Sequence, residues 1–354
     1  MSDLNQLRLE IDRLDDELLK LLNQRSEVSR KVGEAKRAED PNPAIYRPER
    51  EAHILRRLRD SNPGPLPAEA VSRIYHEILS ASSALQRPIR VAYLGPAGTF
   101  SESAVVKQFG RSCEAVACAN FDEVFRRTET GDTDFSMVPV ENSTEGMVPR
   151  ALDLLLSSPL KACAEVVLRV HQNLMRKRAG MDGITKVYSH AQSLAQTQGW
   201  LARNLPGVDR VTVESNAEAA RLASLDENTA ENYGLTILAP KIEDDATNRT
   251  RFIVVGNYDA TPSGKDRTWL VMSAPNKPGA VHALLTPFAK HGVSMTKLES
   301  RPSKIASMPG SWEYLFYVDI EGHQNDRVVA SALAELKAIA PYLKIFGSYP
   351  VGDY

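Results

Sequence analysis

Two cationic side chains of the first segment occupy positions where apolar side chains are expected. Apolar residues recur from Leu4 to Ala35 in alternating steps of three and four, the spacing of a heptad repeat, and we call this row the apolar seam. Arg25 falls on the seam, and Lys36 follows eleven residues later, about three helical turns along the same face. A buried cation is costly unless an anion meets it, so the pair predicts a site for a small dianion. A helix whose basic side chains only lie along apolar surface would show the same pattern.

Small hydroxyl and amide side chains gather in four loops of the middle segment, each near the end of an expected strand. The loops are 95–101 (GPAGTFS), 141–146 (ENSTEG), 188–193 (YSHAQS) and 248–252 (NRTRF). Loops that join strand ends to helix N-termini can bind anions through backbone N–H groups. Neither the GxGxxG nor the GxxxxGK[ST] spacing is present, which argues against a dinucleotide or triphosphate site. Each loop alone could be ordinary turn and cap chemistry, but together they predict a polar cleft without a metal.

Two further motifs lie in the last segment. Residues 276–279 (NKPG) join an expected strand to an expected helix, which exposes backbone N–H groups to a ligand carboxylate. Residues 299–302 (ESRP) end the following expected strand. As bare patterns, both motifs could equally be turn and strand-end residues without a ligand.

Composition limits the class of protein. The 354 residues exceed one usual hydrophobic core, so two or three domains are expected. The 43 basic and 45 acidic residues give a net charge of -2, which provides no basic field for nucleic acid. No run of about 18 apolar residues is present, and the N-terminus is too charged for a signal peptide, so no membrane attachment is expected. Three cysteines without a CxxC pair suit a reducing compartment, which makes the cytoplasm the expected location.

The elements that must position these residues fall into three domains. Residues 1–87 show helical patterns only, with a long first helix and two shorter ones. Residues 89–258 alternate short apolar runs with helical stretches, which predicts α/β architecture. After the polar linker 259–266, residues 267–350 follow a βαββαβ order, which predicts a ferredoxin-like α+β domain.

Residues 4–87 resemble the all-helical chorismate mutase family. The resemblance rests on LRLEIDRLDDELLKLLNQRSEVSRKVGEAK, PERE and SASSALQ. In that family two subunits exchange long helices and build two sites from both chains. The resemblance implies that Arg25, Lys36 and an Arg8 supplied by the partner subunit hold the substrate carboxylates.

The same resemblance assigns the remaining positions of the mutase site. Glu51 would accept the ring hydroxyl, and Lys36 and Gln86 would donate to the ether oxygen, with Ser82 nearby. Ser82 and Gln86 are four residues apart and therefore share a helical face. Arg47 stands where some members carry an aspartate, which leaves its part in substrate binding open.

Residues 89–257 resemble the prephenate dehydratase family through VAYLGPAGTFSE, VPVENSTEGMV, YSHAQSLAQ and TRFIVV. The resemblance implies two α/β subdomains with the site in the cleft between them. It makes Thr250 the residue most associated with catalysis, and we expect its hydroxyl to hydrogen-bond the departing hydroxyl of the substrate. We expect Arg251 or loop amides to hold the side-chain carboxylate. The other candidate cleft residues are Thr99, Ser101, Asn142, Ser143, Thr144, Ser189, His190, Gln192 and Phe252, although a lone histidine after a strand often has a structural role only.

Residues 267–350 resemble the ACT domain attached to prephenate dehydratases, including its ESRP motif. The family's GALV motif is matched in part by residues 279–282 (GAVH). The resemblance implies phenylalanine binding at a dimer interface between ACT domains, with feedback inhibition. The residues that it points to are Asn276, Gly279, Ala280, Glu299, Ser300 and Arg301.

These resemblances imply an enzyme that converts chorismate to prephenate, and prephenate to phenylpyruvate with loss of carbon dioxide and water. Phenylalanine would be its allosteric inhibitor, arogenate is a second candidate substrate, and the assembly would be a homodimer or a higher homo-oligomer. Neither a metal nor an organic cofactor is expected. One alternative is a degenerate mutase domain used only for dimerisation, which the intact mutase positions argue against. Another is a non-enzymatic regulator that binds a small molecule without turnover.

Overall fold

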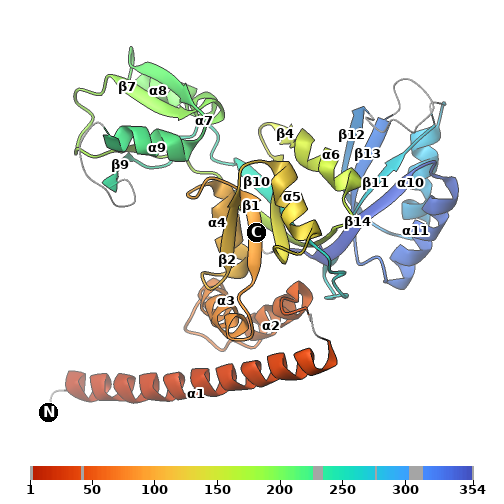
Figure 1. Ribbon diagram of the computed structural model, residues 1–354, viewed down its shortest axis with the longest axis horizontal. Coiled ribbons are helices and arrows are strands. Elements are labelled where there is room, and N and C mark those ends of the chain that lie inside the picture. The colour runs from red at the N-terminus through yellow and green to blue at the C-terminus, as the bar shows by residue number, and fades with distance from the viewer. Residues whose placement is uncertain (1–2, 41–43, 226–233, 276, 303–313, 353–354) are drawn as a thin grey trace.

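The computed structural model describes residues 3–40, 44–225, 234–275, 277–302 and 314–352. Figure 1 shows three parts in chain order: N-terminal helices, an α/β part divided into two lobes, and a C-terminal sheet with two helices. This order confirms the predicted multidomain architecture of an all-α part, an α/β part and an α+β part. Within the described ranges, no helix has the length and apolar character needed to cross a membrane.

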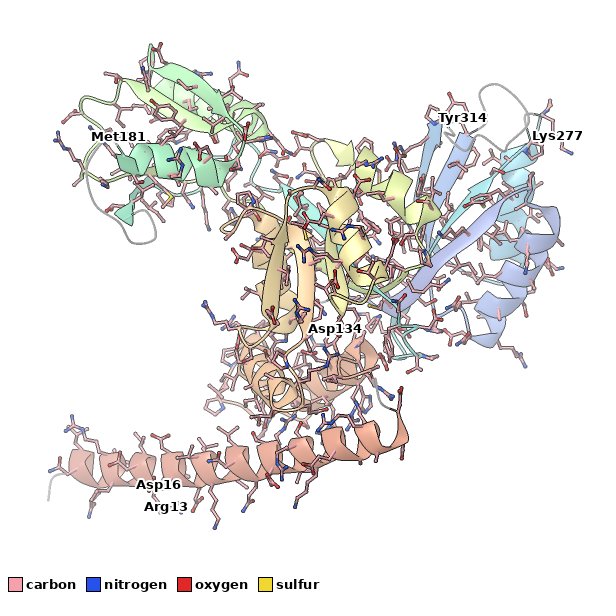
Figure 2. The ribbon with its side chains drawn as sticks, viewed as in Figure 1. Arg13, Asp16, Asp134, Met181, Lys277 and Tyr314 are labelled. Carbon is pink, nitrogen blue, oxygen red and sulfur yellow. The ribbon has the colours of Figure 1, made fainter. Side chains whose placement is uncertain are left out.

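The helical part consists of α1 (Asp3–Glu39), α2 (Pro48–Asp60) and α3 (Ala68–Ala84). α1 has 37 residues and is therefore about 55 Å long at 1.5 Å per residue. Its C-terminal half packs against α3, whereas the half that carries Arg13 and Asp16 extends beyond α2 and α3 (Figures 1 and 2). Apolar side chains of this half are each at least 44% exposed: Leu4, Leu7, Ile11, Leu14, Leu18 and Leu21. The apolar seam thus has no partner among the described residues of the chain.

The first lobe is built on a mixed sheet. Its strands are β1 (Arg90–Leu94), β2 (Glu114–Cys118), β3 (Phe135–Asn142), β4 (Gly146–Met147), β5 (Lys161–Arg169) and β10 (Arg249–Gly256). The order is β2-β1-β3-β10-β5, with β4 paired to β3. β1 runs parallel to β2 and β3, while β10 is antiparallel to β3 and β5. Three helices pack on this sheet: α4 (Phe100–Phe109), α5 (Phe121–Glu129) and α6 (Pro149–Ser157).

The second lobe lies between β5 and β10 in the chain, although these strands are neighbours in the sheet of the first lobe. It contains β6 (Leu174–Arg176), β7 (Lys186–His190), α7 (Ala191–Gln196), α8 (Gln198–Asn204), β8 (Asp209–Val213), α9 (Asn216–Leu225) and β9 (Thr236–Ala239). β7 pairs with β8, and β6 pairs with β9. α7 and α8 are separate helices, because the chain leaves helical geometry at Thr197.

The C-terminal domain confirms the βαββαβ prediction. Its elements are β11 (Asp266–Ser273), α10 (Ala280–Lys290), β12 (Met295–Pro302), β13 (Tyr314–Glu321), α11 (Arg327–Ile339) and β14 (Leu343–Pro350). The antiparallel sheet has the order β12-β13-β11-β14, and both helices cover the face away from the first lobe (Figure 1).

The other face of this sheet packs directly on the first lobe. Trp269 and Phe346 belong to the same hydrophobic core as Leu152 and Leu155 of α6. At Gly347 the two backbones approach so closely that a Cβ atom would lie 2.1 Å from the carbonyl oxygen of Ala162. The first lobe and the C-terminal domain therefore share one core.

Candidate active sites

A cavity of about 800 Å³ lies between the two lobes. Six of the predicted cleft residues line it: Thr99, Asn142 and Thr250 from the first lobe, and Ser189, His190 and Gln192 from the second. They reach one cavity because β3 ends and the antiparallel β10 begins at the edge of the first sheet that faces the second lobe. Hydroxyl, amide and imidazole groups from the two lobes thus line the same cleft.

Thr250 is held at the cavity wall by Asn142, its partner in the β10–β3 ladder. Asn142 Nδ2 donates to Thr250 Oγ1 at 3.0 Å and to Asn248 Oδ1 at 3.1 Å. The amide is fixed from its other end, because Asn142 Oδ1 accepts from the backbone N–H groups of Thr144 and Glu145. Since Thr250 Oγ1 accepts this hydrogen bond, its own proton can be donated to a ligand.

Asn216 organises the opposite wall. Its Oδ1 accepts from Ser189 Oγ at 2.8 Å and from the backbone N–H of His190 at 3.0 Å, and its Nδ2 donates to Ser193 Oγ at 2.8 Å. His190 caps α7, because its Nδ1 accepts from the backbone N–H of Gln192 at 3.3 Å. The imidazole therefore has a structural function at Nδ1. Sequence reasoning missed Asn216, which no motif singled out.

Arg25, Ser82 and Gln86 meet at the junction of α1 and α3. Arg25 Nη1 donates to Ser82 Oγ at 2.6 Å, and Gln86 Nε2 donates to Ser29 Oγ at 3.0 Å. The close approach requires a glycine at position 33, since a Cβ there would lie 2.7 Å from Gln86 Cγ. Ser29 and Gly33 were not predicted from the sequence.

Lys36 and Glu51, two further mutase candidates, each have a hydrogen-bond partner of their own. Lys36 Nζ donates to the carbonyl oxygen of Ala44 at 3.0 Å, and burial together with the positive charge of Arg47 lowers the pKa of Lys36. Glu51 Oε1 lies 2.8 Å from His76 Nδ1. Burial alone would lower the pKa of His76, but the hydrogen bond and the charge of Glu51 raise it. A concentration of cations beside a carboxylate suits a ligand that carries negative charge and a hydroxyl group.

Arg8 is not part of this cluster. It lies seventeen residues before Arg25, which corresponds to about 26 Å along α1, and its side chain is exposed. Its predicted place in a partner subunit's site stays a prediction. In the part of the chain that the structure describes, no group of His, Cys, Asp and Glu side chains is arranged to hold a metal ion.

Comparisons with known proteins cover all three parts of the chain. Family models match at residues 7–87 (chorismate mutase type II), 91–260 (prephenate dehydratase) and 268–338 (ACT domain). The bifunctional chorismate mutase/prephenate dehydratase of Neisseria gonorrhoeae is 49% identical, over 96% of this chain and 95% of that protein. This chain belongs to the bifunctional chorismate mutase/prephenate dehydratase family. The predicted resemblances to the mutase, the dehydratase and the ACT domain are thereby confirmed.

Solved structures resemble the dehydratase and ACT parts. Prephenate dehydratase from Arthrobacter aurescens, in complex with L-Phe, is 32% identical with a TM-score of 0.65, covering 74% of this chain and 90% of that one. GqqA, described as a novel type of quorum quenching acylase, is 27% identical with a TM-score of 0.64, covering 74% of this chain and 98% of that chain. Because proteins with such different descriptions share this fold, the fold alone does not decide the activity.

Two residues of the dehydratase motif Thr250-Arg251-Phe252 do not face the cleft. Arg251 is buried on the opposite side of the sheet, against the ACT domain, so the prediction that it holds a substrate carboxylate is wrong. The physical reason is that successive residues of a strand point to opposite faces. Phe252 follows a bulge in the ladder and is 1% exposed in the core of the first lobe, so its predicted contact with substrate is also wrong.

Three further candidates lie beside the cleft instead of lining it. Ser101 is buried in the first turn of α4. Ser143 Oγ accepts from the backbone N–H of Arg249 at 2.9 Å, and Thr144 offers its backbone N–H to Asn142. Direct binding by these three side chains stays a prediction, and the hydrogen bonds of Ser143 and Thr144 fix the loop.

Of the predicted regulatory residues, Gly279 and Ala280 lie at one end of the ACT domain, where α10 begins. Gly279 is the N-cap of α10 with a positive φ of 76°, which favours glycine, and Ala280 is buried in the first turn. Lys277, from the same turn, and Tyr314, which pairs with Pro302, lie at this end in Figure 2. Glu299 and Ser300 lie on the neighbouring strand β12.

Arg301, from the same strand, has a contact outside the ACT domain. Its Nη2 lies 3.8 Å from Asp153 Oδ1 of α6 in the first lobe. Asn276 lies outside the described residues.

Proposed function

We propose that this chain catalyses two successive reactions under feedback by phenylalanine. The helical site rearranges chorismate to prephenate, and the cleft converts prephenate to phenylpyruvate with loss of carbon dioxide and water. The observation that carries the proposal is the Thr250 hydroxyl, held by Asn142 at 3.0 Å on the wall of a polar cavity. Full-length similarity to bifunctional relatives supports the pairing of the two activities. The proposed domains are 1–87 for the mutase, 89–258 for the dehydratase and 267–350 for regulation.

In the dehydratase step the ring carboxylate leaves as carbon dioxide, and its bonding electrons enter the ring. The ring then expels the C4 hydroxyl group, which leaves as water once protonated. Thr250 donates a hydrogen bond to this oxygen, which polarises the breaking C–O bond. A threonine hydroxyl has a pKa too high for efficient proton transfer near neutrality, so it positions the leaving group and another donor or water supplies the proton. Gain of aromaticity provides the driving force.

The mutase reaction needs neither a nucleophile nor a proton shuttle. Arg25, Lys36 and a partner subunit's Arg8 hold the two carboxylates in a compact conformer, with Arg47 adding positive charge. Lys36 and Gln86 donate to the breaking ether oxygen, and Glu51 accepts the ring hydroxyl. A rate gain of about a millionfold corresponds to roughly 8 kcal/mol, which orientation and preorganised donors can supply.

The exposed apolar seam supports a homodimer in which long helices pair. Full burial of a leucine side chain is worth about 1.5–3 kcal/mol, so six exposed seam residues offer a large driving force for association. Pairing of this kind would bring Arg8 of one subunit to the Arg25 cluster of the other. We place the assembly in the cytoplasm.

Phenylalanine would bind through Gly279 and Ala280, where α10 begins, and through Glu299 and Ser300 of β12. The similar dehydratase from Arthrobacter aurescens contains L-Phe, which supports this ligand. Inhibition requires that phenylalanine bind the less active arrangement more tightly, with a typical coupling of about 1–3 kcal/mol.

One assay tests both activities. Purified protein is given chorismate or prephenate, and chorismate loss and phenylpyruvate formation are followed with and without phenylalanine. Thr250→Ala should lower dehydratase kcat by about 10²–10³, the usual cost of removing one transition-state donor, with mutase turnover unchanged. Thr130→Ala, which removes an exposed hydroxyl of the same lobe, serves as control.

Three other outcomes would contradict the proposed function or the role of Thr250. Binding without turnover of either compound would favour a non-enzymatic regulator. Dehydratase activity alone would favour a mutase part used only for dimerisation. Near-normal dehydratase turnover in Thr250→Ala would refute the role given to that residue, and arogenate offered in place of prephenate tests the second candidate substrate.

A further inference from the structure

Thr250 and Asn142, which face the cleft, have neighbours that face the ACT domain. The β10–β3 ladder pairs Thr250 with Asn142 and, one step on, Arg251 with Glu141. Because side chains alternate between the faces of a sheet, the second pair lies behind the first. A shift of Arg251 or Glu141 therefore moves the backbone that carries the two cleft residues.

Arg251 is tied to the ACT domain by two of its three strong contacts. Its Nη1 lies 2.6 Å from Asp319 of β13, and its Nη2 donates to the Tyr349 hydroxyl of β14 at 2.7 Å. Its Nε lies 2.6 Å from Glu165 of β5. Burial alone would lower the pKa of Arg251, but Tyr349, Asp319 and Glu165 raise it well above its usual value. The guanidinium stays charged, and breaking one of these buried pairs is far more costly than breaking a surface pair.

Glu141 is tied to the strand that carries the regulatory motif. Lys297 Nζ of β12 lies 2.6 Å from Glu141 Oε2 and 3.4 Å from Glu299 Oε2. Lys297 is thus shared between a residue behind the cleft and a residue of the predicted phenylalanine site. Any ligand that changes the position or charge of Glu299 therefore changes how strongly Lys297 interacts with Glu141.

A cavity beside these side chains gives them room to exchange ion-pair partners. Glu141, Arg251, Lys297 and Asp319 border a polar cavity of about 400 Å³ at the junction of the first lobe and the ACT domain. Side chains that line a cavity can change partners without forcing the packed core apart.

We propose that Arg251 and Glu141 are positioning residues for the dehydratase reaction. They set the place of Thr250 and Asn142, and the ACT domain acts on them through Lys297 on one strand and through Asp319 and Tyr349 on two others. This inference rests on the proposed function, because it describes how phenylalanine reaches the Thr250 cleft.

The test uses the full-length protein and two variants that cut the two connections separately. Lys297→Met removes the charge beside Glu141, and Tyr349→Phe removes only the hydroxyl beside Arg251. Lys290→Met is the matched control, because Lys290 pairs with Glu335 at 2.7 Å within the ACT domain, on its exposed helices. Dehydratase kcat, KM for prephenate and the phenylalanine concentration for half-inhibition are measured, with mutase turnover as a check on folding.

Both test variants should lower dehydratase kcat and raise the half-inhibitory phenylalanine concentration about fivefold or more, with KM changed less than about twofold. Lys297→Arg, which keeps the charge, should restore most of both values. In the double variant Glu141→Gln/Lys297→Met, the effects should not add, because both changes remove the same interaction.

If Lys297→Met and Tyr349→Phe match Lys290→Met in kcat and in phenylalanine response, the positioning inference is overturned. Should the wild type form no phenylpyruvate, the proposed function fails instead, and this is visible before any variant is compared.

Discussion

Tyr46 connects the mutase part to the dehydratase core, and its replacement gives a sharp test of that connection. The residue lies two positions after Ala44, whose carbonyl oxygen accepts from Lys36, and directly before Arg47. Its side chain is 5% exposed and packs among residues of the first lobe. The ring centroid lies 4.7 Å from that of Phe109 and 5.4 Å from that of Phe135.

The cost of Tyr46→Ala can be worked out from this burial. A buried aromatic side chain removes roughly 150–250 Å² from water. At about 25 cal/mol per Å², this corresponds to about 4–6 kcal/mol, which is an upper bound because unfolded chains already bury some surface. Measured aromatic-to-alanine changes in cores cost about 3–5 kcal/mol. We therefore expect Tyr46→Ala to lower the free energy of unfolding of the first lobe by about 4 kcal/mol.

Two controls separate packing from other effects. Tyr46→Phe removes only the hydrogen bond with Gln108 and should cost about 1 kcal/mol. Tyr314→Ala removes a tyrosine that is 43% exposed and should cost about 1 kcal/mol or less.

The assay is urea unfolding followed by near-UV circular dichroism, with mutase kcat/KM measured under native conditions. Mutase kcat/KM should fall in Tyr46→Ala, because the loop that holds Lys36 loses its anchor. A loss of stability below about 1 kcal/mol in Tyr46→Ala, or unchanged mutase kcat/KM, would show that the loop is not held by this contact.

Three further changes test the mutase part. Gly33→Ala places a Cβ 2.7 Å from Gln86 Cγ and should lower mutase kcat about tenfold with dehydratase kcat unchanged; equal mutase kcat would contradict the assigned role of Gln86. If the proposed dimer forms through the apolar seam, Leu18→Glu should give a monomer in analytical ultracentrifugation and abolish mutase turnover, while Asp16→Asn, on the same part of α1, should do neither. Because the folded-state pKa of His76 is raised, the stability that it contributes should be complete below about pH 6.5 and lost as the pH rises through that raised pKa. The difference in unfolding free energy between wild type and His76→Leu measures this, and a difference that grows with pH would refute it.

Local patterns predicted the elements well where periodicity was strong. The heptad spacing of α1 and the apolar runs of β3 and β10 were enough to place these elements. The strands 114–118 and 174–176 were missed, because one is only half-buried and the other has three residues. The first has an apolar run of only four residues, 115–118, mostly small ones, and the second has two apolar residues.

The sequence predicted which loops form the cleft. It did not predict which side chains of those loops point into the cleft. Polar residues at strand ends converge because the antiparallel strands β3 and β10 respectively end and begin at the same edge of the sheet. Arg251 was assigned to the wrong face, although alternation along the strand separates it from Thr250. Contacts such as Glu141 with Lys297 join residues far apart in the chain, and no local pattern contains them.

The shared cores restrict how regulation can work in this chain. Trp269 and Phe346 of the ACT domain lie in the core of the first lobe, and Arg251 forms buried ion pairs across the same junction. Swinging the ACT domain away would expose this core and leave charges without partners, at a cost well above the 1–3 kcal/mol of a typical allosteric coupling. A change of ion-pair partners around Lys297, or a small displacement of β10 against β3, requires a free energy within that 1–3 kcal/mol range. We therefore expect phenylalanine to act on Thr250 through the ladder that carries it, with the junction between the domains kept intact.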